Sequence, residues 1–423
     1  PLGFFTKLAA QYGDVVQLRM GPERAFLIGD PGLIRDILVT NQRHYKKGRA
    51  LERSKPLLGE GLLTSEDPTH LRQRRLIQPK CHRDAIESYA NAMSEYAVRT
   101  RDRWEDGATL DISQEMMRLT LGIVGKTLFD ADVESQAKEV GAALTDVLES
   151  FWTMMLPFAD LLERLPVPPL QRAKRARKRL DAMIFGMIRE RRTSTLDRGD
   201  MLSMLLFAQD EEDGGRRLTD QQVRDEALTL FLAGHETTAN ALAWTWYLLS
   251  GAPDVEQRLH AEIDRVIGSR TPQMSDIPQL PYLEQIISES MRLYPPAWMI
   301  GRRALGDQPL GDYVLPDRAL VLMSPYVVQR DARWFDDPDC FRPERWTPAL
   351  KAALPPFAYF PFGGGARRCI GESFAWMELV LVAATLAQRW RIRAVSTQPP
   401  VPQPVMTLRM KNGLKAVVNS RSS

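Results

Sequence analysis

The longest helical pattern in the chain covers residues 219–250 and is apolar on most of its faces. Thr219 and Gln222 form a capping-box pattern at its start, and Gly251 followed by Pro253 ends it. A helix of about 31 residues is about 47 Å long, because each residue adds about 1.5 Å. Since such a helix has almost no polar face for water, the other elements have to pack around it. We therefore predict a large, mainly helical body with this helix in its core.

Short strand patterns lie near both ends of the chain, so the expected class is mainly α with small β-sheets (α+β). Three prolines within residues 165–169 predict a connection before a Lys/Arg-rich helix over residues 171–192. No repeat or low-complexity linker is present, so residues 1–423 are interpreted as one domain. Its expected β-rich parts are about 10–45, 301–328 and 399–418, and its helical body is about 66–300 and 372–391.

The composition excludes several classes of function. A net charge of +3 is too small to indicate nucleic-acid binding. No apolar run reaches the length of a membrane span, so we expect a cytoplasmic monomer, although an anchor upstream of residue 1 stays open. The three cysteines, Cys81, Cys340 and Cys369, are too few for a disulfide framework and indicate a reducing compartment.

Cys369 follows a run of three glycines and directly precedes a strongly helical pattern. Glycines are costly to order, so we expect this backbone to turn its N–H groups toward a negative group. A thiolate at a helix N-terminus beside Arg367 and Arg368 is favoured by the helix dipole and by both charges, and it can bind a soft metal. The alternative is a glycine turn followed by a buried core cysteine.

The middle of the long helix reads Ala-Gly-His-Glu-Thr-Thr over residues 233–238. A glycine beside threonines is unfavourable in a helix by about 1 kcal/mol, and a buried Glu236 needs a partner or a function. One interpretation is a glycine-mediated helix crossing with Glu236 reaching solvent. A zinc-protease motif is excluded, because Ala239 stands where the second histidine would be required.

The cysteine segment resembles the haem-thiolate loop of the cytochrome P450 monooxygenases, with the pattern Phe-x-x-Gly-x-Arg-x-Cys-x-Gly matched at Phe362, Gly365, Arg367, Cys369 and Gly371. The resemblance implies the P450 fold, with the long helix over the haem and the cysteine loop on the opposite face. It makes Cys369 the iron ligand and Phe362 a shield for the sulfur. Gly363, Gly365 and Gly371 would lie next to the porphyrin, and Arg367 would pair with a propionate.

Residues 233–238 resemble the oxygen-binding groove of the same family. By this resemblance the Thr237 hydroxyl bonds toward the Ala233 carbonyl and leaves a notch for O₂ and water. Glu236 and Thr237 would form the acid–alcohol pair that delivers protons. Some relatives attach their haem through a Glu where this chain has Ala233, so we expect haem b that is not covalently attached.

Further matches involve charged residues. His70 and Arg74 resemble the family's contact to the haem propionates, with Arg302, or else Arg303, as a third contact. Glu289 and Arg292, on one helix face, would form with Arg345 a structural cluster that fixes the segment before the cysteine loop.

The resemblance implies a monooxygenase that hydroxylates or epoxidises an apolar substrate, such as a fatty acid, terpenoid or steroid. The Gly-His-Glu-Thr-Thr stretch is similar to that of fatty-acid hydroxylases. The substrate pocket is expected to be lined by Phe151, Met155, Phe231, Ala233, Thr237, Ala297, Trp298, Met299, Val405 and Met406.

No flavin or iron–sulfur motif is present, so electrons are expected from a ferredoxin or flavodoxin-type donor with its reductase, and NAD(P)H acts only through that reductase. The donor is expected to bind a basic surface made by Arg72, Arg75, Lys80, Arg83, Arg367 and Arg368. Two alternatives are a peroxide-driven peroxygenase and a haem-thiolate sensor without turnover. The Glu236–Thr237 pair argues against the peroxygenase.

Overall fold

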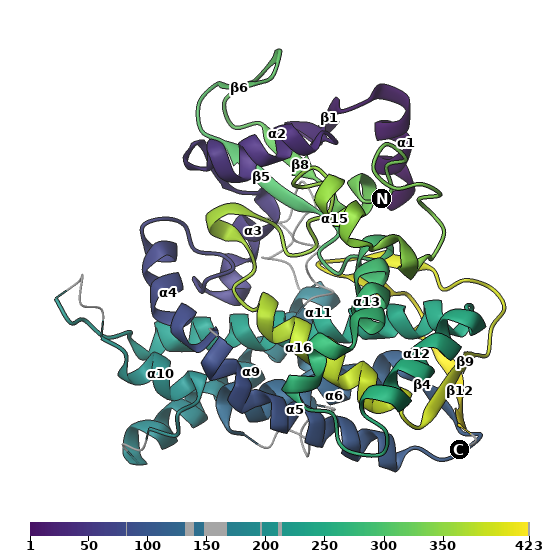
Figure 1. The fold of residues 1–423 in the computed structure, drawn as a ribbon. Coiled ribbons are helices and arrows are strands. Elements are labelled where there is room, and N and C mark those ends of the chain that lie inside the picture. The colour runs from purple at the N-terminus through teal and green to yellow at the C-terminus, as the bar shows by residue number, and fades with distance from the viewer. Residues whose placement is uncertain (82, 132–138, 148–166, 195–196, 210–213, 422–423) are drawn as a thin grey trace.

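The computed structural model describes residues 1–81, 83–131, 139–147, 167–194, 197–209 and 214–421. The long helix is α11 (Asp220–Ser250), and Thr219 and Gln222 close the expected capping box at its start. Its large apolar side chains Phe231, Trp244 and Trp246 are buried. In Figure 1, α11 crosses the middle of the molecule with α16 (Glu372–Ala387) in front of it. The prediction that this helix forms the core is confirmed.

Helices surround α11 on several sides. It packs against α6 (Ile112–Phe129), α9 (Pro168–Ser194), α13 (Pro281–Leu293) and α16. The other α-helices of the described residues are α1 (Leu2–Tyr12), α2 (Pro31–Arg35), α3 (Arg49–Leu58), α4 (Thr69–Ile77), α5 (Arg83–Arg103), α10 (Met201–Phe207), α12 (Pro253–Val266), α14 (Pro325–Val328) and α15 (Pro348–Ala353). Among the described residues, no helix is both long and apolar enough to span a bilayer.

A five-stranded sheet lies beside α1 and α2, at the top of Figure 1, with the strand order β1-β2-β8-β5-β3. Its strands are β1 (Val15–Met20), β2 (Glu23–Ile28), β3 (Tyr45–Lys47), β5 (Ile300–Ala304) and β8 (Leu320–Met323). Strands β2 and β8 are parallel, and the other neighbours are antiparallel. The sheet therefore joins the first residues of the chain to those that follow α13.

The smaller sheets use mostly C-terminal residues. Strands β4 (Thr109–Asp111), β9 (Trp390–Ala394) and β12 (Lys415–Ser420) pair in the order β4-β12-β9. Two hairpins are formed by β6 (Gln308–Leu310) with β7 (Tyr313–Leu315), and by β10 (Pro402–Pro404) with β11 (Leu408–Met410). The small sheets near both ends of the chain agree with the predicted class.

Two predicted boundaries are wrong. Helix α9 begins at Pro168, inside the stretch predicted as a connection, because a proline is tolerated in the first turn of a helix. The helix expected over 372–391 ends at Ala387, and Trp390 begins β9, which pairs with β12. The interpretation of the whole chain as one domain remains a prediction.

Candidate active site

Cys369 lies in the loop that leads into α16. The loop folds back on itself, because the Cys369 N–H donates to the Phe362 carbonyl at 2.9 Å and the Arg368 N–H donates to the Gly365 carbonyl at 3.0 Å. Burial is the largest influence on the Cys369 thiol and raises its pKa, while the Gly371 N–H donates to the sulfur and lowers it. The side chain is nevertheless exposed, because it borders a cavity.

Two of the three glycines are required by close packing around this loop. Gly365 has a φ of +66°, and a Cβ there would lie 1.8 Å from the Leu38 carbonyl oxygen. A Cβ at Gly364 would lie 2.2 Å from the Phe357 ring. We expected the N–H groups of the glycine run to face the thiolate, but the N–H that contacts the sulfur belongs to Gly371. The glycine run instead lets the loop pack against the N-terminal part of the chain.

A cavity of about 390 Å³ separates the cysteine loop from α11. Cys369 and Phe362 border it on one side, and Ala233 and Thr237 of α11 border it on the other. Most of its remaining wall is apolar and is shared among α3, α5, α6, α10, α11, α13, α16 and the segments that follow α3 and α13. Its volume lies in the range of small-molecule sites, about 300–1,000 Å³.

The backbone of α11 carries extra hydrogen bonds where it faces the cavity. The Thr237 hydroxyl donates to the Ala233 carbonyl at 2.7 Å, as the resemblance implies, and the Thr238 hydroxyl donates to the Gly234 carbonyl at 3.3 Å. A Cβ on Gly234 would lie 2.9 Å from Val124 of α6, so this glycine also permits a close helix crossing. Carbonyls shared in this way weaken the helical ladder, which suits a helix that must present a polar notch.

Glu236 does not border the cavity. Its Oε1 accepts hydrogen bonds from the Thr407 hydroxyl at 2.6 Å and from Arg409 Nε, both beyond the far side of the helix. Thr407 in turn accepts from Asn240 at 3.2 Å. The carboxylate is thus buried and paired, and it does not reach solvent as the helix-crossing interpretation proposed.

Six basic residues border the cavity: Lys47, His70, Arg74, Arg302, Arg367 and Arg368. Burial, followed by the charge of Arg367, lowers the pKa of Arg302 to about 10 and that of His70 to about 3. Arg367 pairs with Glu66 at 2.8 Å and with Asp67 at 3.0 Å. Glu372 pairs with Arg368 at 2.5 Å, and the lowered pKa leaves His70 neutral, so Arg302 is the buried cation that best fits a cofactor with carboxylates.

Arg302 and Arg303 point to different places. Arg302 borders the cavity and donates to the Gly301 carbonyl at 2.9 Å. Arg303 forms ion pairs with Glu23 at 3.0 Å and with Glu52 at 3.2 Å, on the other face of the sheet edge. Of these two arginines, only Arg302 is in a position to contact a ligand in the cavity.

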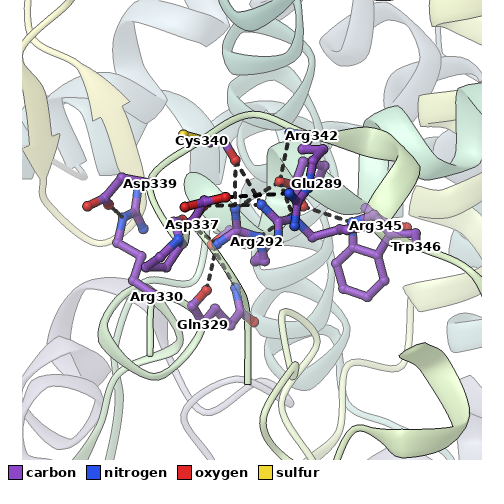
Figure 2. A network of polar contacts seen from close by, with 12 residues as sticks. Glu289, Arg292, Gln329, Arg330, Asp337, Asp339, Cys340, Arg342, Arg345 and Trp346 are labelled. Carbon is purple, nitrogen blue, oxygen red and sulfur yellow. Dashed lines mark hydrogen bonds and ion pairs between the residues drawn. The ribbon is translucent and has the colours of Figure 1, made fainter. Parts of the chain in front are cut away.

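Glu289, Arg292 and Arg345 form a buried charge cluster, which Figure 2 shows with its neighbours. Glu289 Oε1 accepts from Arg292 Nη2 and from Arg345 Nε, both at 2.8 Å, and Oε2 accepts from Trp346 Nε1 at 2.9 Å. Arg292 also donates to the carbonyls of Gln329 at 2.9 Å and Pro338 at 2.6 Å. The cluster therefore ties α13 to the irregular segment that leads toward the cysteine loop.

The predicted pocket residues divide into three groups. Ala233, Thr237 and Ala297 line the cavity. Phe231, Trp298, Met299, Val405 and Met406 lie outside its lining: Phe231 stacks on Phe129 at 4.1 Å, and Trp298 Nε1 donates to the Val405 carbonyl at 2.9 Å. Phe151 and Met155 lie outside the described residues.

Two buried polar residues, Lys47 at the cavity and Glu378 on α16, were not predicted from the sequence. No pattern in the sequence distinguishes Lys47 from the exposed Lys46. Glu378 of α16 is fully buried, and burial raises its pKa well above the ordinary value. Both of its oxygens lack a hydrogen-bond partner, and the Thr238 hydroxyl is its polar neighbour. An acid in the middle of an otherwise apolar helical run was the signal that could have revealed Glu378.

A cysteine thiol that faces a notched helix across an apolar cavity, beside a cluster of basic side chains, defines the site of a haem-thiolate protein. Comparison with known proteins agrees with this site. The family model for cytochrome P450 matches residues 1–416. The chain therefore belongs to the cytochrome P450 family, and its relatives are named as monooxygenases and oxygenases.

Several relatives come from Streptomyces. Cyclooctatin synthase of Streptomyces melanosporofaciens is 40% identical over 410 residues, which cover 96% of this chain and 89% of that protein. Pentalenene oxygenase of Streptomyces avermitilis is 38% identical over 395 residues, which cover 93% of this chain and 87% of that protein. Among solved structures, the retinoic acid-bound cyanobacterial CYP120A1 matches with a TM-score of 0.89 and 25% identity, covering 98% of this chain and 93% of that one. The P450 fold is thus established across nearly the whole chain.

Proposed function

We propose that this P450 monooxygenase inserts one atom of O₂ into a terpenoid. The observation that carries this proposal is the similarity, over nearly the full chain, to two enzymes named for the terpenoids cyclooctatin and pentalenene. The mostly apolar wall of the cavity supports it, because an apolar substrate gains free energy by leaving water for such a wall. Fatty acids and steroids, the other classes that the sequence left open, have no support among these relatives.

We propose Cys369 as the axial ligand of haem b. His70, Arg74, Arg302 and Arg367 would hold its propionates, since all four border the cavity. Ala233 offers no carboxylate for an ester link, so the haem would be held without covalent attachment. The bound haem supplies the activation of O₂, with the thiolate as electron donor to the iron.

Proton delivery is assigned to Thr237 and Glu236. The Thr237 hydroxyl, at the cavity, holds a proton in its bond to the Ala233 carbonyl. Glu236 is held away from the cavity by Thr407 and Arg409. To pass a proton to Thr237, the Glu236 side chain must therefore leave these partners and turn toward the notch.

Electrons would arrive from an acidic ferredoxin or flavodoxin-type protein, itself reduced by an NAD(P)H-dependent reductase. Arg75 and Arg368 lie on the cysteine side, where the Arg74 guanidinium donates to the Arg368 carbonyl at 2.8 Å and joins α4 to the loop. Arg72 Nη2 instead donates to the Arg216 carbonyl at 3.2 Å, just before α11. Leu71, which is 49% exposed, adds an apolar contact next to these charges. Lys80 and Arg83 have side chains outside the described residues. A cytoplasmic location and a monomeric state remain predictions.

The test combines spectroscopy with product analysis. The carbon monoxide complex of the reduced protein should show the red-shifted band of thiolate ligation, and Cys369→Ser should lose it. Titration with pentalenene, a fatty acid and a steroid should give a substrate-induced spin shift with the terpenoid and little with the other two. Strongest binding of the fatty acid would overturn the substrate class. Product formed with peroxide alone, at the rate supported by reductase and O₂, would favour the peroxygenase alternative.

A further inference from the structure

Lys47 is a buried cation whose surroundings do not balance its charge. It lies on β3, is 5% exposed and borders the cavity. Its Nζ donates to the carbonyls of Leu62 at 2.7 Å and Ser65 at 2.6 Å. An ammonium group carries three N–H donors, so these two carbonyls leave one donor for a ligand in the cavity.

Two arginines lie close to this ammonium. Arg302 is the direct cross-strand neighbour of Lys47 in the pairing of β3 with β5. Arg367 donates to the same Ser65 carbonyl, at 3.1 Å. Like charges in such positions repel each other, and burial strengthens the repulsion. Lys47 and Arg367 thus share one uncharged acceptor, the Ser65 carbonyl. A carboxylate in the cavity would give them a charged acceptor.

The acids that face Lys47 compensate this repulsion only in part. Glu66 divides its carboxylate between the Lys47 backbone N–H, at 2.7 Å, and Arg367. Glu226 of α11 accepts from the Leu62 N–H at 2.9 Å, and burial raises its pKa to about 8, so it is largely uncharged at neutral pH. Burial, followed by the charge of Arg367, lowers the pKa of Lys47 to about 7. Without an added anion, a large share of Lys47 is therefore neutral at neutral pH.

We propose that Lys47 is a further residue of the cofactor cradle and that it takes up a proton from solvent when the haem carboxylates bind. The inference rests on the proposed haem site, because the propionates are the anions that enter beside the ammonium. A carboxylate within reach of Nζ favours the charged form and offers an acceptor to its third N–H. Binding of the cofactor and protonation of Lys47 then stabilise each other.

The linkage has a definite sign. The haem-bound state has the higher Lys47 pKa, so its extra affinity is fully present below about pH 7 and is lost as the pH rises above that value. One linked proton changes the affinity about tenfold per pH unit in this window. Lys47→Arg keeps its charge at every pH in this range, so it provides a reference without the linked proton.

The experiment mixes the holoprotein with apomyoglobin and measures the fraction of haem that stays on this protein at equilibrium. Soret absorbance reports this fraction at about pH 6, 7 and 8. The affinity of the wild-type protein divided by that of Lys47→Arg should fall about tenfold between about pH 6 and pH 8. The ratio cancels the pH dependence of apomyoglobin and of the Cys369 thiol, which both proteins share. Lys47→Met should bind haem more weakly at the lowest pH, whereas Lys46→Met, which removes an exposed charge next door, should not.

Each outcome bears on the inference separately from the function. A ratio that stays constant with pH overturns the linked proton, and unchanged haem affinity in Lys47→Met overturns the cradle role. If Lys47→Arg does not fold, Lys47→Met serves as the reference, since it also cannot titrate. The carbon monoxide spectrum of each protein is recorded first: a normal band with a constant ratio defeats only this inference, whereas a missing band in the wild-type protein defeats the proposed haem site itself.

Discussion

Thr237 and Glu236 are neighbours in sequence, but their side chains lead to different parts of the molecule. The bond from Thr237 to the Ala233 carbonyl joins residues four apart on one helix, so the sequence could predict it. The partners of Glu236, Thr407 and Arg409, are 171 and 173 residues away. No local pattern predicts such a pairing. The sequence could therefore indicate that Glu236 needs a partner, but not which residue it is.

Replacing the Thr237 hydroxyl should uncouple the enzyme. Thr237→Ala removes a hydroxyl that borders the cavity, so reductant should be consumed while peroxide accumulates and product yield per electron falls by about a hundredfold, the lower end of the usual contribution of a proton-transfer group. Product and peroxide per electron are the measurements. Thr237→Ser, which keeps the hydroxyl, should recover most of the coupling. Equal coupling in the alanine variant would show that Thr237 has no part in proton delivery.

Removing the one carboxylate of the buried cluster should strongly destabilise the protein. Glu289→Ala leaves the guanidinium groups of Arg292 and Arg345 buried without a counter-ion, at an expected cost of about 3–5 kcal/mol. Glu190→Ala is the control, because this exposed acid forms a surface ion pair with Arg198 that should contribute less than about 1 kcal/mol. Denaturant midpoints of the holoproteins measure both effects. Similar midpoints for the two variants would contradict the structural role of Glu289.

At the scale of elements, long periodic patterns could be predicted and boundaries set by distant partners could not. Helix α11 was predicted within a residue, since its caps and its apolar faces all lie in its own sequence. The end of α16 was not, because Gln388 and Arg389 are good helix formers and only the pairing of β9 with β12 turns Trp390 into a strand residue. The glycine run is a similar case. The sequence could predict that it belongs to the cysteine loop, but not that it contacts Leu38 and Phe357, because those residues lie outside the loop.

Gly365→Ala should prevent the cysteine loop from closing. The added methyl group would clash with the Leu38 carbonyl oxygen. The alanine would also have to keep a backbone φ of +66°, which side chains disfavour. Gly13→Ala is the control for the second effect, because Gly13 has a φ of +84° and nothing within 4 Å of a Cβ. We expect Gly13→Ala to keep a full haem content and Gly365→Ala to lose most of it, measured by the ratio of Soret to protein absorbance. Equal losses would mean that backbone strain, and not the contact with Leu38, is decisive.

For the whole molecule, the direction in which each helix face points decided which pocket predictions agree with the cavity. Ala233 and Thr237 are four residues apart and share the face of α11 that borders the cavity, whereas Phe231 points toward α6 and stacks on Phe129. The sequence could predict which elements meet at the site. It could not predict the rotation of each helix about its axis, because that rotation is set by packing against several distant elements.

We expect the basic surface on the cysteine side to make turnover sensitive to salt. Reversing the charge in Arg75→Glu should raise the KM for an acidic electron donor and weaken the salt dependence of turnover, since fewer complementary charges remain. Arg175→Glu, on the exposed face of α9, is the matched control and should leave both quantities unchanged. Steady-state kinetics at low and high ionic strength gives the answer. Turnover of the wild-type protein that does not fall with salt would count against an acidic partner on this surface.

The cavity takes Lys47 from β3 and Leu379 from α16, and the acid on α11 is held by Arg409 of β11. The site therefore needs residues from nearly the first and nearly the last part of the chain. Lys47 is synthesised early, and most of the polypeptide has to be made before Cys369 can lie across the cavity from it. A chain that stops shortly before β11 would carry its cysteine yet lack Arg409, which anchors Glu236. Because the lining residues span the chain from Lys47 to Leu379, we expect haem capture to be a late step in maturation.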